Sequence, residues 1–200
     1  MFNLTAKGEG MKKWKLSIVL APAAIAVGIG AIAIAQGTDN SAQVKRGEYL
    51  VTVGGCNDCH TPKKMGPMGP EPDMSRKLMG HPALEIIPPI PTDGFGMGKW
   101  MAATNGHLSA WAGPWGVSFA ANLTPDNLTG SGAWTEKSFM DALRTGKHLG
   151  TGRPILPPMP WPNYGQMTDE DLKAIFAYLR SIPAISNQVP QPIPPPASGH

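Results

Sequence analysis

The pattern of apolar positions along the chain is helical in three places. The first predicted helix begins at the capping residues 39–41 and ends at the glycine pair 54–55. The second begins at Thr135 and stops at Gly146, and the third begins at Thr168, with acidic residues in its first turn. The apolar stripes of the three helices are, in chain order, Val44, Leu50 and Val51; Phe139 and Leu143; and Leu172, Ile175, Phe176 and Leu179.

The segments between these helices differ from them in composition and lack the helical pattern. Residues 61–91 are dense in proline and glycine, which predicts a loop with one or two helical turns over residues 74–79. Short runs of β-branched or aromatic residues separated by turn signals predict a small β-hairpin or meander over residues 100–121. The many prolines between residues 151 and 167 exclude a regular helix there. The pattern as a whole favours a mainly α fold.

The first 35 residues have the layout of an export signal. Three lysines at positions 12–15 precede an uncharged run from Leu16 to Ala35, which ends in an A-x-A pattern. This order is typical of a cleavable secretory signal peptide. The alternative is an uncleaved membrane anchor through residues 14–35, because about 20 apolar residues can cross a bilayer. The A-x-A pattern favours cleavage, and both interpretations predict a periplasmic protein, which the anchor would attach to the inner membrane.

Composition and charge divide the chain further. The 200 residues include 24 glycines and 22 prolines, so that much of the single expected domain is loop. The net charge of +3 belongs to the first 35 residues, which hold four of the 17 basic and one of the 14 acidic side chains. The near-neutral remainder has no basic block of the kind that marks nucleic-acid binding. We therefore expect a folded domain over residues 36–182 and a flexible proline-rich tail over residues 183–200.

The candidate chemistry lies in the run Cys56-Asn57-Asp58-Cys59-His60, which contains the only two cysteines of the chain. Two thiols at this spacing can each add across a vinyl group of a haem, and the adjacent imidazole can bind the iron. The motif predicts one covalent haem c, with Cys56 and Cys59 as the attachment sites and His60 as an axial ligand.

A redox dithiol, a disulfide and a zinc site are the alternatives for the same motif. A structural zinc site needs about four protein ligands, and no second cysteine pair or closely spaced histidine pair is present. A thioredoxin-type pair follows a strand of a βαβ unit, whereas Cys56 follows the glycine pair that ends the first predicted helix. The pattern therefore favours haem.

A haem that transfers electrons usually has a second axial ligand, methionine or histidine. Met159 lies between Pro158 and Pro160, just before the third predicted helix. Rigid prolines reduce the entropy that a loop loses when it presents a side chain at a fixed place. Met159 is therefore the first candidate, with Met167 and then His148 as the alternatives.

Several motifs together resemble those of the bacterial class I cytochromes c, over about residues 42–182. The match begins with residues 46–51, which run into the haem motif and Thr61-Pro62. Residues 122–126, followed by Gly130, Gly132 and Trp134, resemble a loop of the cytochrome c domains that serve periplasmic dehydrogenases. Residues 157–161 and the last helix complete the similarity.

The resemblance implies a class I cytochrome c fold with His60 and Met159 as the iron ligands. In that family the first and last helices cross beside the haem, which would pack Gly47 near Ile175, Tyr178 or Leu179. The chain departs from small members by a long loop-rich insertion between His60 and Trp134, which would contain the β-hairpin. It also has one attachment motif, where many dehydrogenase cytochrome subunits have two or three.

The surroundings of the haem are less strongly indicated. The free ring nitrogen of His60 needs an acceptor, commonly a backbone carbonyl, for which the downstream prolines are candidates. Trp134, Arg153 and Asn122 carry groups that could donate to the haem propionates. Trp134 could instead be a hydrophobic contact at a helix start, and Arg153 a solvated loop charge.

These features predict a one-electron carrier rather than an enzyme, cycling between Fe(II) and Fe(III). Its partners would be a redox donor and acceptor, such as a dehydrogenase, a quinol-oxidising complex or a terminal oxidase. The first alternative is a haem-bearing relay subunit of a larger dehydrogenase or respiratory complex. The second is an open-site haem enzyme or gas-binding protein, in which the insertion brings His81 or His107 to the open side of the iron.

Overall fold

The computed structural model describes residues 40–90 and 94–195. The predicted signal or anchor over residues 1–35 lies outside the described residues, as do the last five residues of the predicted tail. Within the described part of the chain, no helix is long and apolar enough to cross a membrane. The elements are, in order, a helix over residues 40–53, α2 (Cys56–His60), β1 (Lys63–Gly66), β2 (Gly69–Pro72), the 3₁₀ turn η1 (Met74–Arg76), β3 (Ala103–Thr104), β4 (Ala110–Gly113), β5 (Gly116–Phe119), α3 (Glu136–Thr145), the 3₁₀ turn η2 (His148–Gly150), α4 (Trp161–Tyr164) and α5 (Asp169–Ser181).

The three predicted helices are present; the start of the first falls at the edge of the described residues, and capping chemistry accounts for the ends of the other two. The Thr135 hydroxyl accepts a hydrogen bond from the Ser138 N–H at the start of α3, and Gly146 ends this helix with φ of 68°. That left-handed conformation costs glycine less than any residue with a Cβ atom. At α5 the Thr168 hydroxyl accepts a hydrogen bond from the Asp171 N–H. Side-chain caps therefore begin both helices where the sequence predicts.

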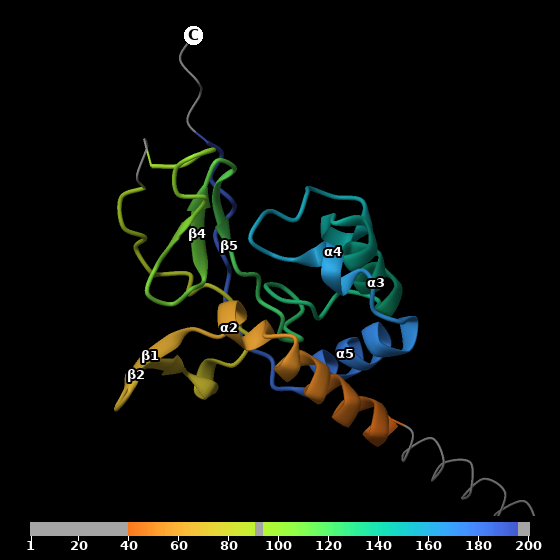
Figure 1. Ribbon diagram of the computed structural model, residues 1–200. Coiled ribbons are helices and arrows are strands. Elements are labelled where there is room, and N and C mark those ends of the chain that lie inside the picture. The colour runs from red at the N-terminus through yellow and green to blue at the C-terminus, as the bar shows by residue number, and fades with distance from the viewer. Residues whose placement is uncertain (1–39, 91–93, 196–200) are drawn as a thin grey trace, which may run out of the picture. The chain divides into compact units, whose positions relative to one another are not determined.

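The helix over residues 40–53 crosses α5 at Gly47 (Figure 1). A Cβ atom at position 47 would lie 2.6 Å from the carbonyl carbon of Ala174 and 2.7 Å from the Cβ atom of Tyr178. Real Cβ atoms essentially never approach other atoms that closely. The crossing therefore depends on the missing side chain, and the predicted packing of Gly47 near Tyr178 is confirmed.

The hydrophobic core comes mainly from these helices. Its buried residues belong to the helix over residues 40–53, to α3 and to α5, with Leu78 added from the chain after η1. The sheets are small and antiparallel: a two-stranded sheet β1-β2 and a three-stranded sheet β3-β4-β5. The structure thus combines a helical core with two small sheets. The core residues are Leu50, Val51, Leu78, Phe139, Leu143, Leu172, Ala174, Ile175, Tyr178 and Leu179.

The insertion between His60 and Trp134 holds both sheets. The meander β3-β4-β5 confirms the prediction for residues 100–121, with Gly113 paired to Gly116 across its second turn. The hairpin β1-β2 contradicts the prediction of a loop for residues 61–91. Its strands are short, and the prolines lie in β2 alone. Proline suits edge strands and so does not exclude a two-stranded ribbon.

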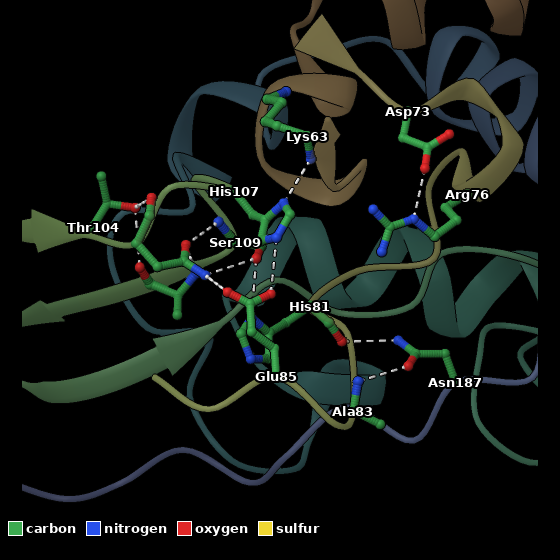
Figure 2. Close-up of polar contacts among 12 residues, drawn as sticks. Lys63, Asp73, Arg76, His81, Ala83, Glu85, Thr104, His107, Ser109 and Asn187 are labelled. Carbon is green, nitrogen blue, oxygen red and sulfur yellow. Dashed lines mark hydrogen bonds and ion pairs between the residues drawn. The ribbon is translucent and has the colours of Figure 1, made fainter. Parts of the chain in front are cut away.

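The predicted flexible tail is corrected for its described residues. We call residues 183–195 the C-terminal strap, because hydrogen bonds tie them to the domain. The buried Asn187 amide donates to the carbonyls of Met79 and His81 and accepts from the Ala83 N–H, at 2.8–2.9 Å; Figure 2 shows the bonds to His81 and Ala83. Proline richness indicates an extended chain. It does not reveal the hydrogen-bond partners of that chain, which lie about 60 to 108 residues earlier in the sequence.

A second polar cluster joins β1 to the loop before β4. The His107 Nδ1 atom accepts a hydrogen bond from the Lys63 N–H at 2.9 Å, so the proton of the neutral ring lies on Nε2. That Nε2 atom is 3.2 Å from a carboxylate oxygen of Glu85 (Figure 2). The other Glu85 oxygen accepts from the Asn105 amide at 2.9 Å. This cluster fixes the insertion against the residues that follow the cysteine motif.

Candidate functional site

The cysteine motif forms the short helix α2, which begins directly after Gly55 at φ of 68°. Residues three apart on a helix lie on the same face, so the two thiols point the same way. Cys56, Cys59 and His60 all line one cavity. The fold therefore presents the three chemical groups of the motif together.

The His60 ring is fixed by one backbone contact. Its Nδ1 atom lies 2.7 Å from the carbonyl oxygen of Ala121, to which a protonated Nδ1 donates. This leaves Nε2 as the ring nitrogen with a free lone pair. Burial lowers the pKa of His60, against a smaller raising effect of the Ala121 contact, so the neutral ring is favoured. A neutral imidazole with one free nitrogen is what an iron ligand requires.

The predicted backbone acceptor for His60 is therefore present, but it is Ala121 and not a downstream proline. Ala121 lies two residues after the end of β5. It lies 61 residues after His60, and no local sequence signal connects the two.

The thiols themselves do not fit a redox or metal site. Burial raises the pKa of the Cys56 thiol to about 11, and burial likewise raises that of Cys59. Reactive cysteines and metal-binding cysteines need an easily formed thiolate, which a lowered pKa provides. Among the described residues, no group of three or more His, Cys, Asp or Glu side chains could hold a metal ion. These observations disfavour the dithiol and zinc interpretations.

The cavity is large and mostly apolar, as a haem site requires. Its empty volume, open mouth included, is ≈ 1490 Å³. Helical residues such as Val51, Ile175 and Leu179 form one part of its wall, and residues 118–123 of the insertion form another. The covalent attachment groups, one free imidazole nitrogen and an apolar wall all meet here, so the residues present fit a haem bound through Cys56 and Cys59.

Met159 is the one methionine among the described residues that lines this cavity. Met167, the second candidate, does not line it, although both methionines pack against the hydrophobic core. His148, the third candidate, lines the cavity, but its ring lies edge-on to Trp134 with 4.9 Å between centroids. Burial lowers the pKa of His148, and the positive charge of Arg153 lowers it further. The geometry thus brings Met159 and His60 to one cavity and leaves Met167 outside it.

The three propionate candidates also line the cavity, but they differ in what they can donate. The Asn122 amide donates to the carbonyl of Ile185 at 2.8 Å and to the Thr129 hydroxyl at 3.3 Å, which uses both of its hydrogens. Asn122 is therefore a structural residue that fastens the strap. The exposed Arg153 donates only to the neighbouring Pro154 carbonyl at 3.3 Å, and the Trp134 indole N–H has no hydrogen-bond partner among the described residues.

The two histidines proposed for an open-site haem do not reach this cavity. His81 is fully buried, with Nδ1 2.9 Å from the Ser109 hydroxyl and its ring 4.8 Å from that of Phe119. His107 lies in the cluster with Glu85. Neither is among the cavity-lining residues, which weakens the open-site alternative.

Several further residues complete the site without any sequence signal. Tyr164 of α4 donates its hydroxyl to the Gly54 carbonyl at 2.5 Å and so joins the last part of the chain to the turn before Cys56. Ser118 of β5 and Pro192 of the strap both line the cavity. Their positions follow from long-range pairing, which the spacing of residues does not reveal.

Comparison with known proteins agrees with this geometry. The family model described as "Cytochrome c" matches residues 44–183, which is most of the described domain. The chain belongs to the cytochrome c family. Proteins of this family bind haem c covalently through the motif that Cys56, Cys59 and His60 complete, so the cofactor of this chain is haem c.

Individual relatives narrow the class of cytochrome. The cytochrome c domain is 32% identical over 146 residues to the gluconate 2-dehydrogenase cytochrome c subunit of Pantoea cypripedii. This alignment covers 73% of this chain and 24% of that protein. The domain is 29% identical over 173 residues to the cytochrome c subunit of the quinone-dependent alcohol dehydrogenase of Gluconobacter oxydans (strain 621H), covering 85% and 27%. It is also 30% identical over 148 residues to a diheme cytochrome c-type protein of Cereibacter sphaeroides, covering 74% and 38%.

The chain spans about a quarter of the length of the dehydrogenase relatives. It is thus a cytochrome c domain homologous to haem-bearing subunits of dehydrogenases, and the resemblance seen in the sequence is confirmed.

Proposed function

We propose that this chain is a periplasmic one-electron carrier whose haem is held axially by His60 and Met159. When bound, the haem supplies the Fe(II)/Fe(III) couple, and the protein provides binding, orientation and electrostatics. The observation that carries the proposal is that His60 and Met159 line the same apolar cavity.

The residues of the chain have distinct roles in this proposal. Cys56 and Cys59 hold the group covalently, and the Ala121 carbonyl keeps the His60 ring in one orientation. His60 and Met159 would be the two protein ligands of the iron, which would leave no open position for a substrate. The apolar wall excludes water and lowers the local dielectric constant, which favours the less charged state of the cofactor.

The relatives favour a dehydrogenase as the redox partner. The two dehydrogenase relatives named above are each the cytochrome c subunit of a dehydrogenase. The corresponding alternative is that this domain relays electrons inside such a complex. Co-purification in mild detergent supports the relay when a dehydrogenase subunit stays bound, whereas a persistently monomeric protein supports the free carrier.

Replacing Met159 with leucine tests the ligand set, because leucine keeps the volume and removes the thioether. We expect the oxidised wild-type protein to have a low-spin spectrum with the weak far-red band of methionine–iron coordination. Met159→Leu should lose this band and let the reduced protein bind carbon monoxide rapidly and stoichiometrically, with the covalent haem retained.

Met167→Leu is the matched control, since it makes the same change outside the cavity. It should keep the band and should not bind carbon monoxide. A wild-type protein that is high-spin when oxidised, or a Met159→Leu variant that keeps the band, would contradict the proposal. Rapid carbon monoxide binding by the reduced wild-type protein would favour the open-site alternative.

A further inference from the structure

The loop that presents Met159 has few hydrogen bonds of its own. Its first part is tied to the end of α3, since the Ile155 N–H donates to the Gly146 carbonyl at 2.8 Å. Beyond that point Pro157, Pro158 and Pro160 have no N–H to donate. Among the described residues, the bond from the Ser118 hydroxyl to the Pro157 carbonyl, at 2.5 Å, is the one hydrogen bond of residues 156–159.

Ser118 makes this bond from a fixed position. It is buried on β5, where it pairs with Trp111 of β4, and it lines the cavity beside the loop. Its hydroxyl lies 3.5 Å from the Trp111 carbonyl, which is long for a hydrogen bond, so Pro157 is the principal acceptor. The contact joins two segments 39 residues apart, one from the insertion and one from the loop.

The C-terminal strap secures the other edge of β5. Val117, the neighbour of Ser118, donates to the Ile193 carbonyl at 2.8 Å and accepts from the Ile193 N–H at 3.0 Å. The strap is anchored upstream by the buried Asn187 amide (Figure 2). Strand β5 is thus held by β4 on one edge and by the strap on the other.

We propose that Ser118 is a positioning residue for Met159, and that the strap supports it by clamping β5. A loop without other hydrogen bonds can adopt many conformations, and each anchor that restricts them reduces the entropy lost on ligation. The Ser118 hydroxyl fixes the Pro157 carbonyl two residues before the thioether. The insertion therefore acts on the second axial ligand as well as on the first, whose ring it fixes through Ala121. This inference rests on the proposed ligation by Met159.

Ser118→Ala in the haem-bearing protein is the direct test. The variant should keep its covalent haem but should populate the form without methionine ligation roughly two- to tenfold more, as expected for one hydrogen bond. The readouts are the intensity of the far-red band, the pH at which this band disappears, and the rate of carbon monoxide binding to the reduced protein. We expect a weaker band, an earlier loss of it with rising pH and faster carbon monoxide binding.

Two variants serve as controls for Ser118. Ser118→Thr keeps a hydroxyl on β5 and should restore the wild-type band. Ser181→Ala removes a similar bond, from a serine hydroxyl to the Tyr178 carbonyl at 2.8 Å on α5, and should leave the band unchanged. An unchanged band, pH dependence and carbon monoxide rate in Ser118→Ala would overturn the inference.

The strap is tested independently at Ile193. Ile193→Pro removes the N–H that bonds Val117, whereas Ile193→Ala keeps it. The proline variant should shift the same readouts in the same direction as Ser118→Ala, and the alanine variant should not. Equal behaviour of the two variants would remove the strap from the proposal. A wild-type protein without the band would refute the proposed ligation by Met159. A wild-type protein with the band, together with variants whose band is unchanged, would refute only the positioning role.

Discussion

Replacing Gly47 with alanine tests the close crossing between the helix over residues 40–53 and α5. The new Cβ atom would lie 2.6 Å from the Ala174 carbonyl carbon, whereas ordinary contacts begin at 3.4 Å. The carbonyl carbon alone requires the helices to separate by about 0.8 Å, the difference of the two distances, and the carbonyl oxygen of Ala174, which lies closer still, requires more. A gap of about 0.5–1 Å already forfeits a quarter to a half of the dispersion energy of the atoms that it separates.

The expected free-energy change follows from two opposing effects. Overpacking a core costs about 1–3 kcal/mol, and the upper end applies here because the obstacle is backbone. Alanine in place of glycine within a helix returns up to about 1 kcal/mol. We expect the free energy of unfolding to fall by about 2 kcal/mol. The assay is urea denaturation of the haem-bearing protein, followed by far-ultraviolet circular dichroism.

Gly106→Ala is the matched control, because a Cβ atom there meets nothing within 4 Å. Its unfolding free energy should stay within about 0.5 kcal/mol of the wild type. The reasoning fails if Gly47→Ala is as stable as the wild type or more stable, since the gain in helix propensity would then outweigh the steric clash.

Two further predictions concern local interactions. Hydrogen bonds from Ser75, and then from Arg76, lower the pKa of Asp73 from 3.8 to about 2, so its stabilising effect is complete above about pH 4 and is lost as the pH falls towards 2. Asp73→Asn should therefore reduce the loss of thermal stability over this acid range, and an unchanged acid profile would count against it. Thr135→Ala removes the cap of α3 and should lower the unfolding free energy by about 1 kcal/mol in urea denaturation, whereas an unshifted midpoint would show that the cap contributes nothing.

The helices and the attachment motif were predictable because their signals are local. Thr135, Gly146 and Thr168 carry the chemistry of helix ends within a few residues of the ends themselves. Cys56, Cys59 and His60 lie in one turn of helix, so their spacing in sequence is nearly their spacing in space. Helical periodicity and capping depend on neighbours along the chain, and a sequence contains those neighbours directly.

The contacts that hold the site in place were not predictable, because they join residues that lie far apart in the sequence. The acceptor for His60 is a carbonyl at Ala121, and a backbone carbonyl carries no mark of residue type. Proline and glycine in residues 61–91 gave the signal of a loop, although a two-stranded ribbon tolerates them at its edges. The strap was expected to be flexible because extended, proline-rich chain has no periodicity, whereas its attachment depends on Asn187 finding carbonyls more than 100 residues away.

The residues that line the cavity run from Val51 to Pro192, almost the whole described chain. During synthesis the cysteines therefore emerge long before the loop around Met159 and the strap exist. The cavity wall cannot be complete until the last of these segments has been made, and loop closure over such lengths is entropically costly. A covalent tether offsets this cost, because the thioether bonds can retain the cofactor on a chain that has not yet folded. Covalent attachment in this domain thus keeps the cofactor in place before the cavity is complete, in addition to strengthening its binding afterwards.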